Sequence, residues 1–233
     1  MTMLTYYLTK NPKAYRKLQD EIDTVSQGNP ITLDQAKEMK YLQCVIKEAL
    51  RCFPVVGYHL PRVVPPVPSL PPHTNVEGGK EICGYYFPTG SIVGMNAWVI
   101  HRDTTIFGPD ADQFNPDRWL DPTAAAHMDK YMFAFGGGSR TCIGRNFAMA
   151  AMSKLVPEFL RLFEIELANP KEQLKYDNHW YFFWPEDVDG RFIKPEHVWV
   201  KSQAEEVTLR SRCGSWDRRI CFRCLRLRFF VFL

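Results

Sequence analysis

The fold of this chain is indicated by the sequence Phe135-Gly136-Gly137-Gly138-Ser139-Arg140-Thr141-Cys142-Ile143-Gly144. Apolar residues at helical spacing follow it from Phe147 to Phe163, so Cys142 is expected just before the N-terminus of a helix. Free backbone amides and the helix dipole at that position favour a thiolate over a thiol. The glycines allow the backbone to turn tightly and to approach a flat partner closely. The segment is therefore expected to present one cysteine to a bound group.

The residues around the cysteine suggest which group that is. Arg140 lies two residues before Cys142 and offers a cation to an anionic partner. A soft thiolate, a loop that permits close approach and a nearby cation suit axial ligation of a haem iron, whose propionates are anionic. An isolated cysteine is more often a buried structural residue. Here several residue types occur together at a defined spacing, which favours a haem ligand over a buried structural cysteine.

The segment resembles the haem-binding signature Phe-x-x-Gly-x-Arg-x-Cys-x-Gly of the cytochrome P450 family of haem-thiolate monooxygenases. The resemblance implies that Cys142 is the catalytic residue and the axial ligand of the iron of haem b (iron protoporphyrin). It also implies a set of residues that shape the haem loop or hold the cofactor: Phe135, Gly136, Gly138, Arg140 and Gly144.

A second motif lies on a helix predicted around residues 42–50, where apolar residues follow the i, i+3, i+4, i+7, i+8 pattern. Glu48 and Arg51 share one side of this helix, and an isolated pair of this kind is usually exposed. Ahead of Phe-Pro, however, Glu-x-x-Arg resembles the K-helix motif of the family. The segment 114–119, which contains Arg118, resembles the family's Pro-Glu-Arg-Phe region. The resemblance implies a buried ionic network of Glu48, Arg51 and Arg118 that supports the haem loop.

Strands are predicted over residues 55–64 and 82–100, with a turn at Pro88-Thr89-Gly90. Arg62 resembles a family position whose arginine binds a haem propionate. The residue pattern equally permits a solvent-exposed strand arginine. His101 resembles a structural histidine of the family.

Composition and charge exclude some classes of partner. The chain has 233 residues, 45% of them hydrophobic, and a formal net charge of +3. The arginine-rich segment 202–233 accounts for this excess, and the remainder is nearly neutral, which gives no reason to expect nucleic acid as a partner. An odd number of cysteines, seven, without regular spacing indicates reduced thiols in an intracellular compartment. No apolar run is long enough for a transmembrane helix.

The family resemblance implies a mainly α fold with small β-sheets (α+β) and a haem-binding domain part over residues 1–183. The family's oxygen-activating helix and membrane anchor precede the segment that resembles residues 1–27. We therefore expect the C-terminal portion of the cytochrome P450 fold, truncated at its N-terminus, with any haem poorly covered. Residues 65–76 are expected to be a proline-rich insertion, and residues 184–233 a divergent basic tail without folded structure.

The resemblance implies a monooxygenase that inserts one oxygen atom from O2 into a small organic substrate, which is aromatic for some fungal relatives. Electrons would come from an NADPH-dependent reductase. Full-length relatives are typically anchored in the endoplasmic-reticulum membrane, through segments that this chain does not contain. Two alternatives remain open. The first is a non-catalytic haem-binding fragment or truncated gene product that lacks the oxygen-activating helix, and the second is a non-enzymatic interaction protein that uses the proline-rich segment or the basic tail.

Overall fold

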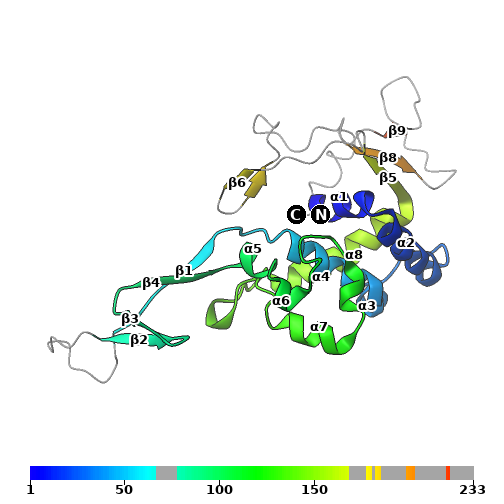
Figure 1. Cartoon of the computed structure of the whole chain (residues 1–233). Coiled ribbons are helices and arrows are strands. Elements are labelled where there is room, and N and C mark those ends of the chain that lie inside the picture. Colours follow the sequence, from blue (N-terminus) through cyan, green and yellow to red (C-terminus); the bar gives the residue numbers. More distant parts are fainter. Residues whose placement is uncertain (67–77, 168–176, 180–181, 185–197, 203–218, 221–233) are drawn as a thin grey trace.

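The computed structural model describes residues 1–66, 78–167, 177–179, 182–184, 198–202 and 219–220. Helices gather in one body, and the strands β1 to β4 extend from it to one side (Figure 1). The helices are α1 (Thr2–Lys10), α2 (Pro12–Ser26), α3 (Leu33–Glu38), α4 (Lys40–Cys52), α5 (Ala97–Ile100), α6 (Thr104–Phe107), α7 (Pro122–Asp129) and α8 (Arg145–Leu162), with the 3-10 helices η1 (Pro116–Trp119) and η2 (Gly138–Arg140). The mainly α architecture predicted from the sequence is confirmed.

The strands form small antiparallel sheets. They are β1 (His59–Val63), β2 (Gly79–Ile82), β3 (Tyr85–Pro88), β4 (Ile92–Asn96), β5 (Phe163–Leu167), β6 (Asp177–His179), β7 (Phe182–Trp184), β8 (Val198–Ser202) and β9 (Arg219–Ile220). Strand β1 pairs with β4, β2 with β3, and β6 with β7, while β8 lies between β5 and β9. The β1–β4 register aligns His59 with Asn96 and Val63 with Ile92.

Helix α4 lies at the centre of the helical body and contacts α1, α2, α3, α8 and η1. Its side chains Leu42, Val45 and Ile46 are fully buried in the main core, as the apolar pattern predicts. Burial of a side chain of this size contributes about 1.5–3 kcal/mol relative to its exposure. The same core includes Leu160 of α8 and Ile165 of β5, so α4 sets the position of the chain that follows the Cys142 loop.

The N-terminus of α4 is capped by another helix. The residue before it, Met39, provides no side-chain cap. Instead the carboxylate of Glu21 on α2 accepts hydrogen bonds from the backbone amides of Tyr41 (2.9 Å) and Leu42 (2.8 Å). These amides have no partner within the helix, and a carboxylate at this end also interacts favourably with the helix dipole. The register of α4 against α2 is thereby fixed by polar as well as apolar contacts.

Two expectations about the strands need correction. Residues 97–100 form helix α5 rather than the end of a strand, because the Asn96 side chain accepts a hydrogen bond from the amide of Trp98 (2.9 Å) and caps a helical turn. The run from Ile82 to Phe87 is also not one strand. It turns back on itself at Cys83 (φ 53°) and Gly84 (φ 80°), which joins β2 to β3 as a tight hairpin.

The C-terminal region differs from its expectation where it is described. Strands β8 and β9 lie within residues 184–233, for which the sequence predicts no folded structure, and β8 pairs with β5. Most of the proline-rich segment 65–76 lies outside the described residues. Within the described part of the chain, no helix is both long and apolar enough to cross a membrane.

Removal of the Glu21 carboxylate tests the capping of α4. We expect Glu21→Ala to lower the free energy of unfolding by about 1–2 kcal/mol, because two helix amides lose their acceptor. Asp20→Ala, which changes an exposed neighbour on the same helix, is the matched control and should stay within about 0.5 kcal/mol. Urea unfolding followed by circular dichroism measures both changes. Equal effects of the two substitutions would contradict this role of Glu21.

Candidate functional site

A buried carboxylate organises the region behind the Cys142 loop. Glu48 is fully buried on α4 and accepts hydrogen bonds from Arg51 through Nε (2.8 Å, to Oε2) and Nη2 (2.8 Å, to Oε1). Arg118 Nε (3.1 Å) and the amide of Asn115 (2.8 Å) also donate to Oε1. The indole Nε1 of Trp119 donates to Oε2 (2.8 Å). Donors from α4 and η1 thus converge on one side chain and join these two elements.

Arg51 extends this network to the chain before η1. Its guanidinium is fully buried, and Nη1 donates to the carbonyl oxygens of His101 (2.6 Å) and Ala111 (2.5 Å), while Nη2 donates to that of Gln113 (2.9 Å). Burial acts to lower the pKa of Arg51, but the hydrogen bonds and charge of Glu48 prevail and raise it. Arg51 is therefore a permanent cation that holds three separate carbonyl groups.

Arg118 pairs with a second carboxylate. Its Nη1 donates to Oδ1 of Asp110 (3.1 Å) and to the carbonyl of Phe107, and its Nη2 lies 3.0 Å from Oδ2 of Asp110. Partial burial acts to raise the pKa of Asp110, but the Asn115 amide group and Arg118 lower it overall. Two cations and two carboxylates therefore lie together, so the buried charges are balanced.

His101 connects the network to the segment that carries the cysteine. The ring is fully buried, with Nδ1 3.0 Å from the carbonyl oxygen of Arg51 and Nε2 2.9 Å from the amide nitrogen of Phe133. Burial lowers the pKa of His101 to about 4. The ring is therefore neutral at physiological pH. Burial also raises the pKa of the neighbouring Cys52 thiol to about 12, so that this cysteine stays protonated.

The Cys142 loop is held by its own backbone. The amide of Gly136 donates to the carbonyl of Phe133 (2.9 Å), and the amide of Cys142 donates to that of Phe135 (2.9 Å). Gly136 and Gly138 have φ values of 73° and 63°, a region that residues with a side chain adopt only with strain. These two glycines let the loop fold back so that Cys142 lies beside Phe135.

Cys142 is an exposed free thiol three residues before the first residue of α8, Arg145. A side chain at Gly144 would place its Cβ 3.7 Å from the cysteine sulfur, in van der Waals contact with it. The next apolar side chains are open to solvent: Ile143 is 102% and Phe147 71% exposed. Large apolar side chains exposed beside a thiol are typical of a surface that another group covers.

Two arginines lie on or beside this loop. Arg140 ends η2 and is exposed. Arg62 is exposed on β1, where its Nη1 donates to the carbonyl of Pro61 (2.9 Å). On the same strand, Leu60 Cδ1 lies 3.5 Å from where a Cβ of Gly136 would be, so β1 runs along the loop. Because alternate strand residues share a face, Arg62 lies on the face of β1 that contains Leu60.

These features fit the haem that the sequence motif implies. One exposed thiol can serve as the single protein ligand of the iron, and exposed apolar side chains flank it. Glycine backbone at Gly138 leaves open space where a Cβ would lie, which permits close approach of a flat ring. Arg140 and Arg62 supply cations of the kind that bind carboxylates.

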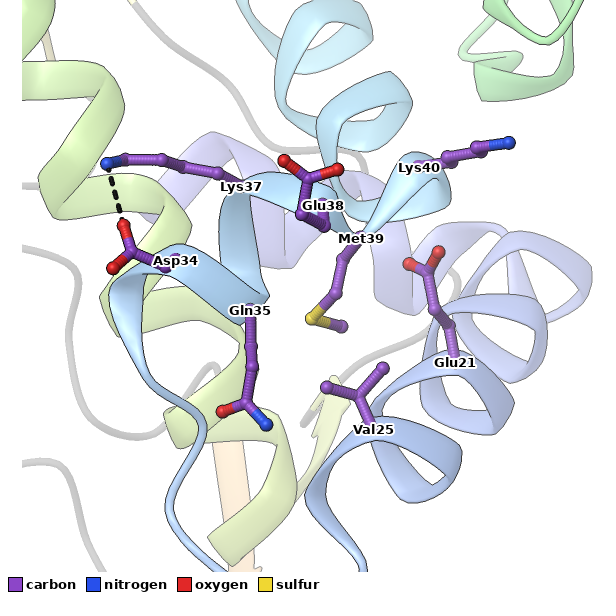
Figure 2. A pocket seen from close by; sticks show the side chains of 8 residues that line it. All are labelled: Glu21, Val25, Asp34, Gln35, Lys37, Glu38, Met39 and Lys40. Carbon is purple, nitrogen blue, oxygen red and sulfur yellow. Dashed lines mark hydrogen bonds and ion pairs between the residues drawn. The ribbon is translucent and has the colours of Figure 1, made fainter.

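A hollow of about 550 Å³ lies elsewhere, between α2 and the junction of α3 with α4 (Figure 2). Figure 2 shows Met39 and Val25 pointing toward each other inside it, with Lys37 and Asp34 paired at the rim. The residues that line this hollow belong neither to the Cys142 loop nor to the Glu48 network. It is therefore a separate surface feature.

The structure brings the residues singled out by the motifs into two groups. Glu48, Arg51 and Arg118 are in direct contact. The loop contains Phe135, Gly136, Gly138, Arg140, Cys142 and Gly144, with Arg62 on the adjoining strand. The sequence motifs assign no site role to Trp119 and only a structural one to His101. The signal for Trp119 is an indole donor directly after Arg118, and for His101 a lone histidine directly after the apolar residues 97–100.

Comparison with known proteins relates the chain to a large enzyme family. A model of the family described as cytochrome P450 matches residues 1–188. Pisatin demethylase from Fusarium vanettenii is 41% identical over 186 residues, 80% of this chain and 34% of that protein. Cytochrome P450 monooxygenase cicH from Emericella nidulans is 35% identical over 209 residues, 88% of this chain and 38% of that protein. The chain thus spans about a third of the length of these relatives.

Loss of one partner from the buried network should be costly. We expect Glu48→Gln to lower the free energy of unfolding by about 3–5 kcal/mol, because buried Arg51 loses the carboxylate it is paired with and Arg118 keeps only Asp110. Lys37→Ala breaks the exposed Asp34–Lys37 pair, which has the same i, i+3 spacing, and should cost less than about 1 kcal/mol. Chemical denaturation of both variants gives the comparison. A loss for Glu48→Gln as small as that for Lys37→Ala would refute the balanced buried network.

Acid should destabilise the fold through His101. In the unfolded chain this ring binds a proton near its ordinary pKa of 6.5, whereas in the fold it remains neutral down to about pH 4. Between these values the unfolded state holds more protons, so stability falls with decreasing pH by up to about 1.4 kcal/mol per unit. Denaturation of the wild type and of His101→Gln across this window isolates the contribution. Identical pH slopes would show that His101 is not held neutral.

Proposed function

The chain belongs to the cytochrome P450 family, and on this basis we propose that it provides the haem-ligand portion of a haem-thiolate monooxygenase. In this proposal the Cys142 thiolate would be the protein ligand of the haem iron. The observation that carries it is the exposed Cys142 thiol, which lies on a glycine loop between exposed apolar side chains and ahead of helix α8. When bound, haem supplies an iron that activates O2 with two electrons from a redox partner.

The residues of this chain hold and orient the cofactor. Gly136 and Gly138 keep the loop in a turned conformation that would let the cysteine backbone approach a flat ring. Arg140 and Arg62 would supply the cations that hold the haem propionates. The Glu48–Arg51–Arg118 network and His101 position this loop from behind and take no part in the chemistry.

The proposed reaction is insertion of one oxygen atom from O2 into a small organic substrate, with electrons from an NADPH-dependent reductase. One similar protein is named a demethylase. Oxygen insertion at a methyl group is a chemical route to demethylation, so small methyl-bearing molecules, aromatic ones included, are the first substrates to test.

Thiolate ligation by Cys142 is tested by the absorption spectrum of the reduced, carbon-monoxide-bound protein reconstituted with haem. We expect the wild type to show the red-shifted Soret band of thiolate ligation and Cys142→Ala to lack it. Cys83→Ala removes the other exposed cysteine of the described residues and should retain the band. Absence of the band from the wild type, or its survival in Cys142→Ala, would refute the assignment. A band without turnover would favour haem binding without catalysis.

A further inference from the structure

His101 lies between α4 and the Cys142 loop and is bonded to both. Its imidazole is fully buried at the C-terminal end of α5. Ring Nδ1 is 3.0 Å from the carbonyl oxygen of Arg51, in the last turn of α4, and Nε2 is 2.9 Å from the amide nitrogen of Phe133. In return, Arg51 Nη1 donates to the His101 carbonyl (2.6 Å). Side chain and backbone of one residue thus link α4 to the start of the loop.

The two partners determine where the ring carries its proton. A backbone carbonyl only accepts hydrogen bonds and a backbone amide only donates them. Nδ1 must therefore be protonated toward Arg51, and Nε2 must be bare toward Phe133. A second proton on Nε2 would face the Phe133 N–H group. Among nearby charges, Arg51 and Arg102 oppose that proton and Glu48 favours it, while the ring of Phe107 packs edge-on at 6.1 Å.

Phe133 in turn anchors the loop that ends at Cys142. Its carbonyl accepts the amide of Gly136 (2.9 Å), which closes the first turn of the loop. Its ring lies against Gly137, where a Cβ would come within 2.9 Å of the ring carbon Cε1. Phe135, two residues on, accepts the amide of Cys142 (2.9 Å). The path from His101 to the cysteine therefore runs from the His101 ring to the Phe133 amide, along the chain to Phe135, and through the backbone hydrogen bond between Phe135 and Cys142.

We propose that His101 is a positioning residue: its ring, protonated at Nδ1 alone, holds Phe133 in place and so sets where the Cys142 loop stands relative to α4. The consequence for haem ligation rests on the proposed function. The consequence for the loop concerns this chain alone and is measurable without haem.

The wild-type protein tests the tautomer directly. Nitrogen-15 NMR of the imidazole, without haem, should show a proton on Nδ1 and none on Nε2, with a scalar coupling through the hydrogen bond to the Phe133 amide. A proton on Nε2, or a ring that exchanges between the two tautomers, would overturn the proposal. This measurement uses the wild-type protein, so it tests the proposal even if the substitutions at His101 prevent folding.

Two substitutions test the two ring nitrogens of His101 separately. In His101→Gln the side-chain oxygen reaches the place of Nε2 and keeps an acceptor for Phe133. In His101→Asn the amide nitrogen takes the place of Nδ1 and keeps the donor to Arg51, but the loop loses its partner. Hydrogen exchange of the Phe133 and Gly136 amides should rise about tenfold in His101→Asn and by less than about threefold in His101→Gln. Equal exchange in the two variants, relative to amides of α4, would overturn the proposal.

The haem-loaded protein gives the second readout. We expect His101→Gln to retain the red-shifted Soret band of the reduced carbon-monoxide complex and His101→Asn to lose part of it, because a displaced loop weakens thiolate ligation. If the wild type itself lacks this band, the proposed function fails, while the tautomer and exchange measurements still decide the role of His101. If exchange differs as expected but both variants keep the full band, the loop is positioned without effect on the ligand.

Discussion

The structure depends on the burial of one carboxylate, Glu48. An unpaired charge at this depth would cost several kcal/mol, so the fold is stable only when the donors of Arg51, Arg118 and Trp119 all reach it. These donors come from α4 and from η1, which are far apart in the sequence. The carboxylate therefore specifies one arrangement of α4 and η1, and this arrangement also constrains the position of the segment between them. Apolar packing alone is non-directional and would tolerate several arrangements.

This arrangement is transmitted to the Cys142 loop by polar contacts that leave the loop itself exposed. Arg51 holds the carbonyl of His101, and the His101 ring holds the amide of Phe133. The cysteine thus lies at the surface, where a cofactor can reach it. The backbone of its loop is held in position by hydrogen bonds to the buried network. Rigidity behind a site and access in front of it are what ligand preorganisation requires.

Much of this could be predicted from local patterns. The spacing around Cys142 predicted the loop before a helix, and the apolar periodicity around Glu48 predicted α4, because both signals lie within a few turns of chain. The capping of α4 by Glu21 and the bonds of His101 to Arg51 and Phe133 could not be predicted, because they join distant segments through backbone groups that have no sequence signature. The β-propensity of residues 97–100 predicts a strand, but they form helix α5 because the Asn96 side chain caps a helical turn there.

The separation of Glu48 from Arg118 along the chain has a consequence for synthesis on the ribosome. The two residues are 70 positions apart. At roughly 5–20 residues per second, Glu48 of α4 is synthesised several seconds before Arg118 of η1. During that interval the Glu48 carboxylate has Arg51 of its own helix but not Arg118 as a partner, so it stays hydrated. Helix α4 therefore cannot yet pack against η1. The helices that precede η1 can assemble early by local contacts, but closure of the nascent domain around α4 waits for the arrival of η1.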